Sequence, residues 1–121
     1  FEYGTRDCML LHGLLITIEL YEKWIWQMKD GRIKELAEYL RENLSKIPKC
    51  VIHTPIEWEK SSGNTTFSMK GYSLGELSGY LSRDWHIYTR GVGELDGTRI
   101  STCHFNRYDE VNKLVMALKA M

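Results

Sequence analysis

The spacing of hydrophobic residues changes several times along this chain, and these changes constrain the fold more than any other feature. From Ile33 to Ile47 apolar residues recur every three or four positions, which predicts an amphipathic helix that Pro48 ends. From Asn64 to Lys70 they alternate with polar residues, as in a half-buried strand. A chain of 121 residues that mixes both periods has room for one core of helices packed on a sheet.

The other segments complete this pattern. We expect a strand at Cys50–Thr54, a short helix opened by a Ser73/Glu76 capping box, strands at Trp85–Arg90 and Thr98–Phe105, and a last helix that carries Val111, Leu114, Val115 and Leu118. This order predicts an α/β domain with a small, mostly antiparallel sheet of about four strands and helices packed on one face. Arg90 and Arg99 then lie on neighbouring strands joined by a short loop.

Polar residues of the Ile33–Ile47 helix are expected on its outer face. They are Lys34, Glu35, Glu38, Arg41 and Glu42. Before this helix, Asp7 is a suitable N-cap for a longer one that runs from about Cys8 to Met28. This longer helix is apolar on nearly all sides, so nearly all of it needs to be covered, and alone it would drive self-association.

Composition excludes some classes of partner. Sixteen basic and sixteen acidic residues give no net charge, which argues against binding to nucleic acid or an anionic membrane. The longest apolar run, Leu14–Ile18, is too short to span a bilayer. Three cysteines without a disulfide-framework spacing favour a reducing compartment, and we expect a cytoplasmic protein. The chain begins with phenylalanine rather than methionine, so we expect a fragment of a longer protein.

The segment Gly97-Thr98-Arg99-Ile100-Ser101, followed by Phe105-Asn106 and a helical pattern, carries the strongest functional signal. It predicts an arginine mounted on a strand to bind an anion, because a guanidinium matches a carboxylate with two parallel hydrogen bonds. The plainer interpretation is that Arg99 is a solvated strand residue or an edge-strand charge that prevents aggregation.

A second segment, Phe1-Glu2-Tyr3-Gly4-Thr5-Arg6-Asp7, opens the chain. Together the two ends resemble the class V aminotransferases, which are pyridoxal-phosphate enzymes that include cysteine desulfurases, selenocysteine lyases and isopenicillin N epimerase-like proteins. The resemblance implies that residues 1–30 are an inter-domain segment and long helix leading from a missing large domain. Residues 31–121 then form the small carboxy-terminal α/β domain of a fold-type I enzyme, so the fragment's partners would be its own missing amino-terminal large domain and a second subunit.

The resemblance also assigns roles to residues at the two ends. Thr5, with Gly4, would contact the phosphate of pyridoxal 5'-phosphate in the other subunit of a homodimer, and Arg99 would bind the α-carboxylate of an amino-acid substrate, with Arg90 beside it. Asp7 stands where the family commonly has asparagine. Arg107 replaces the usual threonine, so capping of the final helix is expected to fall to Asn106.

The reaction type follows from what the chain lacks. Arg90-Gly91 resembles the pair that opens the active-site loop of desulfurases, but no cysteine follows in Val92–Leu95, and Cys103 is expected inside a strand. Desulfurase activity is therefore the least favoured branch, and transamination, epimerisation or elimination in an isopenicillin N epimerase-like parent remains. No Schiff-base lysine is recognisable, so we expect the isolated fragment to contain no catalytic residue and to be inactive.

The sequence also allows other functions. His53, His86, Cys103 and His104 suggest zinc, but neighbouring strand residues point to opposite faces, so we expect no metal site. The main alternative is a stand-alone α/β module for carboxylate binding or dimerisation, in which Arg99 and Arg90 act without a cofactor. A purely structural domain is the third possibility.

Overall fold

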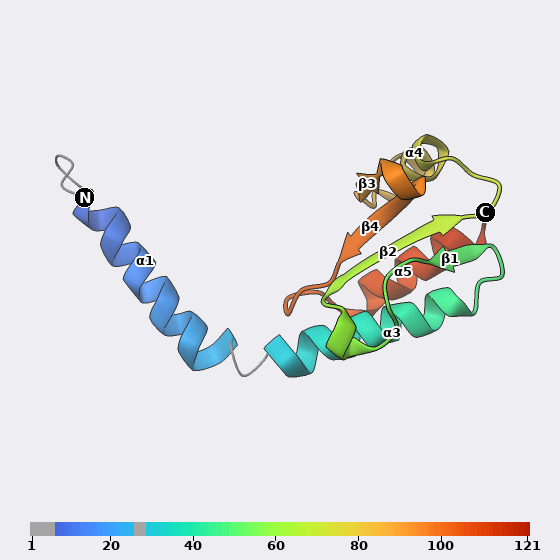
Figure 1. Cartoon of the computed structure of the whole chain (residues 1–121). Helices are drawn as coiled ribbons and strands as arrows, with labels where there is room; N and C mark the ends of the chain where they lie inside the picture. Colours follow the sequence, from blue (N-terminus) through green and yellow to red (C-terminus); the bar gives the residue numbers. More distant parts are fainter. Residues whose placement is uncertain (1–6, 26–28) are drawn as a thin grey trace.

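The computed structural model describes residues 7–25 and 29–121 of the chain (Figure 1). In chain order its elements are α1 (Cys8–Leu20), π-helical turns Tyr21–Ile25 and Lys29–Ile33, α3 (Lys34–Ser45), β1 (Cys50–Ile52), a 3-10 turn Trp58–Lys60, β2 (Asn64–Met69), α4 (Leu74–Trp85), β3 (Arg90–Val92), a 3-10 turn Gly93–Leu95, β4 (Gly97–Ser101) and α5 (Tyr108–Lys119). The predicted order of helices and strands is confirmed.

The four strands form one open antiparallel sheet in the order β1-β2-β4-β3. Thr65, Phe67 and Met69 of β2 are buried on one face, whereas Thr66 and Ser68, which point to the other face, are only half-buried. Helices α3, α4 and α5 cover the buried face, and Figure 1 shows α3 and α5 running along the sheet. The predicted fold class is therefore confirmed, and the sheet keeps one face without helices.

A single hydrophobic core lies between the sheet and its three helices. Strand β2 and helices α3, α4 and α5 supply large side chains that are almost completely buried, and each fully buried leucine or phenylalanine stabilises the fold by about 1.5–3 kcal/mol. The core residues are Leu36, Leu40, Leu44, Ile47, Phe67, Met69, Leu77, Leu81, Val111, Leu114, Val115, Ala117 and Leu118. The helices and the sheet thus form one packing unit.

Helix α4 connects this core to the loop between β3 and β4. The expected capping box is present: Glu76 N donates to Ser73 Oγ (3.4 Å), and Ser73 N donates to Glu76 Oε2 (2.8 Å). The next amide, Leu74 N, donates to Asp96 Oδ1 (2.8 Å), which holds the start of the helix against the β3–β4 turn. The two capping carboxylates therefore fix where α4 begins.

The predicted strand at Trp85–Arg90 is wrong. Helix α4 continues to Trp85 and ends at His86, which adopts a left-handed conformation (φ 53°). Only Arg90 of the predicted range belongs to a strand. The segment between them leads the chain from the helix to the sheet edge.

The predicted strand at Thr98–Phe105 is too long, because β4 ends at Ser101. Beyond it, Cys103 N donates to Asn106 Oδ1 (2.8 Å) and Asn106 N donates to the Cys103 carbonyl (3.0 Å), which turns the chain towards α5. Glu110 Oε2, not Asn106, accepts from the Arg107 amide at the start of α5 (2.9 Å). The expected capping role of Asn106 is therefore wrong, and Asn106 shapes the turn instead.

Arg41 was expected on the outer face of its helix, but only 2% of it is exposed. Its guanidinium donates to Thr65 Oγ1 (3.2 Å), to Ser61 Oγ (2.7 Å) and to the carbonyl oxygens of Ser62 and Asn64 (3.3 Å for Asn64). These four neutral acceptors satisfy the buried cation, as burial of a charge requires. Through these hydrogen bonds, Arg41 connects α3 to the loop that precedes β2.

Helix α1 lies apart from the α/β unit in Figure 1, and all its side chains are exposed. Asp7 caps it as predicted, since its Oδ1 accepts from Met9 N (2.9 Å) and Leu10 N (3.1 Å). The α-helical part ends at Leu20, before the predicted end at Met28, which lies outside the described residues. In the part of the chain that the structure describes, no helix combines the length and apolar character needed to cross a membrane.

Replacing Arg41 with leucine is expected to lower the free energy of unfolding by about 2–4 kcal/mol, because the buried acceptors lose their donor. Burial already lowers the pKa of the Arg41 guanidinium, and nearby Glu38 raises it. Urea unfolding followed by circular dichroism measures the change. The matched control is Arg83→Leu at an exposed position of α4, which should have little effect. Equal effects of the two variants would contradict a structural role for Arg41.

Cys50, at the start of β1, gives a prediction about pH. Burial raises the pKa of its thiol from 9.0 to about 11, so the fold favours the neutral thiol. Its contribution to stability is therefore complete below about pH 9 and is lost as the pH rises through about 11. The difference in unfolding free energy between the wild type and Cys50→Ala should shrink over this range. A difference that stays constant from pH 8 to pH 11 would refute the prediction.

Candidate functional site

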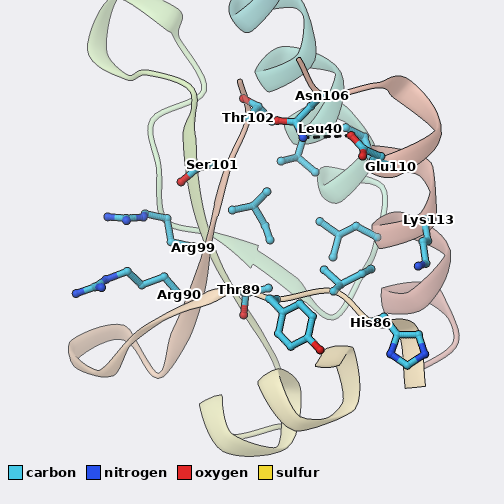
Figure 2. Close-up of a pocket in the computed structure, with 15 residues that line it drawn as sticks. Leu40, His86, Thr89, Arg90, Arg99, Ser101, Thr102, Asn106, Glu110 and Lys113 are labelled. Carbon is cyan, nitrogen blue, oxygen red and sulfur yellow. Dashed lines mark hydrogen bonds between the residues drawn. The ribbon is translucent and has the colours of Figure 1, made fainter. Parts of the chain in front are cut away.

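Arg90 and Arg99 lie directly opposite each other on the paired strands β3 and β4, as the sequence predicted. Figure 2 shows their side chains running parallel and pointing to the same side. They project from the sheet face that the helices leave uncovered, because Thr98 and Ile100, on either side of Arg99, pair with the buried residues Phe67 and Thr65. The two guanidinium groups are therefore neighbours on an accessible face.

Neither guanidinium has an acidic partner in residues 7–25 and 29–121, because none of the ion pairs found there includes Arg90 or Arg99. The Nε atom of Arg99 is buried and has no hydrogen-bond partner among the described residues. Buried polar atoms in native proteins nearly always have a partner, so this N–H is suited to an acceptor from water or from a bound molecule. An anion would supply it.

The rest of the open face is polar but uncharged around Arg99. Thr66 is its direct partner on β2, and Ser101, the next residue of β4 on this face, donates to Asn64 Oδ1 (2.7 Å). Further along the sheet, the ring of His53, which follows β1, lies 2.8 Å from Ser68 Oγ of β2. None of these neighbours was predicted as part of the site, although the two-residue period of β2 and β4 places Asn64, Thr66, Ser68 and Ser101 on the face of Arg99.

The strand that carries Arg99 is held tightly by its neighbour. A Cβ atom at Gly97 would lie 2.7 Å from the carbonyl oxygen of Phe67, so only glycine lets β4 approach β2 this closely. The next residue, Thr98, is completely buried and donates through Oγ1 to the Arg90 carbonyl (3.3 Å). These contacts hold the backbone of β4, and with it Arg99, in a fixed position, as a binding residue requires.

A cavity of about 650 Å³ lies on the opposite side of β4, between this strand, the segment before β3 and α5. Leu40, Ile100, Val111 and Leu114 form its apolar part, and Glu110 and Lys113 are among its polar residues. Arg90 and Arg99 also border the cavity, but Figure 2 shows that both side chains extend away from it. The cavity and the arginine pair are thus separate features.

Other residues singled out from the sequence have different outcomes. Gly4 and Thr5 lie outside the described residues. Cys103 and His104 were expected on opposite faces of a strand, but they follow β4, and Cys103 Sγ lies 3.4 Å from His104 Nδ1. Within the described ranges, no three histidine, cysteine or acidic side chains gather into a group able to hold a metal ion.

The comparison with protein families assigns the chain to a family. The model of the family described as Aminotransferase class-V matches residues 1–114. Because this match covers most of the chain, the chain belongs to the class V aminotransferase family. The comparison with curated proteins gives no match.

Several solved structures share the fold of this chain. They include the apo cysteine desulfurase from Thermococcus onnurineus NA1 (TM-score 0.83, 21% identity, 99% of this chain and 32% of that chain) and a NifS-like protein (0.79, 21%, 98% and 34%). A third is the cystine C-S lyase C-DES in complex with its product cysteine persulfide (0.78, 20%, 98% and 31%). This chain spans about a third of the length of these structures, and at such identities the similarity shows the fold alone.

The family assignment confirms the expected cofactor of the parent protein, pyridoxal 5'-phosphate. One matched structure, a C-DES mutant, has glycine covalently linked to this cofactor. In the present chain the Asp7 carboxylate already accepts from the Met9 and Leu10 amides at the start of α1. These two amides therefore already have an acceptor within the chain.

Replacement of Gly97 with alanine tests the close approach of β4 to β2. The added Cβ would meet the backbone of Phe67 at 2.7 and 3.3 Å, so β2 and β4 must separate, and we expect a loss of roughly 1–3 kcal/mol in unfolding free energy. Gly93→Ala is the control, because no described atom lies within 4 Å of a Cβ atom there. Urea unfolding of both variants measures the difference, and a Gly97→Ala protein as stable as Gly93→Ala would disprove the close approach.

Proposed function

We propose that this chain is the carboxy-terminal domain of a pyridoxal-phosphate-dependent enzyme that acts on an amino acid, and that Arg99 binds the α-carboxylate of the substrate. The observation that carries the proposal is the buried Arg99 Nε atom, which has no partner among the described residues and stands on a polar, accessible face. A carboxylate is planar and accepts two parallel hydrogen bonds from a guanidinium. It is the acceptor that best fits this donor in an enzyme of this family.

The work of this chain is to position the substrate. The cofactor, when bound, supplies an electron sink for the bond broken at the substrate Cα. Arg99 fixes the carboxylate end of the amino acid, and the tight β2–β4 pairing at Gly97 keeps Arg99 itself from moving. Fixing one end of the substrate determines which Cα bond is presented to the cofactor, and such orientation lowers the barrier to reaction.

The assembly of the parent enzyme is part of the proposal. Residues 1–30 would lead from the large domain into residues 31–121, and Gly4 and Thr5 would contact the cofactor phosphate of the other subunit in a homodimer. The exposed apolar side chains of α1, such as Met9 (82% exposed) and Leu10 (72%), support a cover by further protein. Three cysteines at a spacing that fits no disulfide framework support a cytoplasmic location.

For the reaction, we propose transamination, epimerisation or elimination in an isopenicillin N epimerase-like parent, rather than desulfuration. The 3-10 turn Gly93–Leu95 between β3 and β4 contains no cysteine, and Cys103 lies beyond the end of β4. The turn therefore offers no sulfur nucleophile at the position that resembles the desulfurase loop. The lysine that binds the cofactor would come from the missing large domain.

Spectroscopy of the protein expressed from the complete parent reading frame tests this proposal. We expect a visible absorption band of lysine-bound cofactor that borohydride removes, and a change in this band when amino acids are added. Arg99→Ala should keep the band but weaken amino-acid binding by about tenfold or more, because a charge-assisted pair is lost. Arg99→Lys should recover part of the loss, since a lysine keeps the charge but not the planar fork.

Arg83→Ala, an exposed arginine of α4, is the control for this experiment. Amino-acid binding that is equal in Arg99→Ala and Arg83→Ala would contradict the role of Arg99. A parent that is colourless and does not respond to pyridoxal phosphate would instead favour the alternative, a carboxylate-binding or dimerisation module without a cofactor.

A further inference from the structure

Placing Arg90 opposite Arg99 lowers the stability of the sheet unless a second negative charge is present. Like charges that face each other directly across two strands destabilise a sheet. Arg90 and Arg99 face each other in this way, and their side chains run parallel rather than apart (Figure 2). One carboxylate bound to Arg99 would balance only one of the two charges.

The surroundings do not supply the second negative charge. The nearest acidic residues in sequence are Glu94 and Asp96, in the turn between the two strands, and neither forms an ion pair with an arginine in the described part of the chain. Asp96 Oδ1 is already occupied by the Leu74 amide (2.8 Å). On the same sheet face, the β2 neighbours Thr66 and Asn64 are uncharged. As far as residues 7–25 and 29–121 are concerned, the pair therefore carries two uncompensated positive charges.

The two arginines are also unequal in ways that suggest different tasks. Arg99 lies on the inner strand β4, is half-buried and has its Nε shielded from solvent. Arg90 is exposed at the start of β3, the last strand of the sheet. Arg99 is thus suited to the α-carboxylate, which every amino acid carries in the same place. Arg90 is suited to an acidic group at the end of a substrate side chain.

We propose that the substrate is an amino acid with a second acidic group in its side chain, which Arg90 binds while Arg99 binds the α-carboxylate. This inference rests on the proposed function of Arg99. Side chains that face each other on antiparallel strands start about 4.5–5.5 Å apart, so their ends can bind the two ends of one short diacid. Each guanidinium would then have its own acidic partner, and the two positive charges would be compensated.

Ligands without an amino group test the inference apart from turnover. Cofactor-free full-length parent is titrated calorimetrically with succinate and glutarate, and with butyrate and valerate as single-charge ligands of matching chain length. We expect the diacids to bind about tenfold or more tightly than their single-charge counterparts, because one further charge-assisted contact forms. Arg90→Gln should bring this ratio close to one, Arg99→Gln should weaken both kinds of ligand, and Arg83→Gln should leave the ratio unchanged.

The outcomes separate the two proposals. Equal binding of diacids and monoacids, or a ratio that Arg90→Gln does not alter, overturns the inference, and the second result means that a residue other than Arg90 binds the second carboxylate. If the cofactor-loaded parent then still responds to amino acids and loses this response in Arg99→Ala, the proposed function stands without the preference for diacids. If neither kind of ligand binds and amino acids produce no spectral change, both proposals fail.

Discussion

The buried guanidinium of Arg41 is the interaction on which the rest of this domain depends. Its four hydrogen bonds join α3 to the loop before β2 and to the first residues of that strand. Asn64 and Thr65, two of its partners, pair with Ser101 and Ile100 of β4. The position of Arg99 therefore follows from a charge buried on the far side of the sheet.

The two faces of the sheet differ in how their polar and charged groups are paired. On the helix-covered face nearly every large side chain is apolar, and the buried arginine there has all the acceptors it needs. On the open face, Arg90 and Arg99 lie side by side, and the buried Nε atom of Arg99 has no hydrogen-bond partner among the described residues. Proteins break the rules of charge pairing and hydrogen bonding mainly where they bind something. The open face is where this chain breaks both.

Hydrophobic period predicted the order of elements, the antiparallel sheet and the proximity of Arg90 to Arg99, because each of these follows from local spacing. The prediction that Arg41 lies on the outer face of its helix was wrong. Arg41 follows Ala37 by four residues and precedes Leu44 by three, so this arginine lies on the buried face of α3 despite its charge. The helix end at His86 and the strand end at Ser101 depend on a left-handed residue and on the Asn106 side chain. Such features depend on single residues and their local contacts, so the spacing of hydrophobic residues does not predict them.

Arg41 has a consequence for the behaviour of the domain in acid. All four of its acceptors are hydroxyl or carbonyl oxygens, which do not gain a proton in the range where carboxylates do. Mild acidification therefore leaves these four hydrogen bonds intact. The connection between α3 and the start of β2 thus depends on no group that titrates in mild acid.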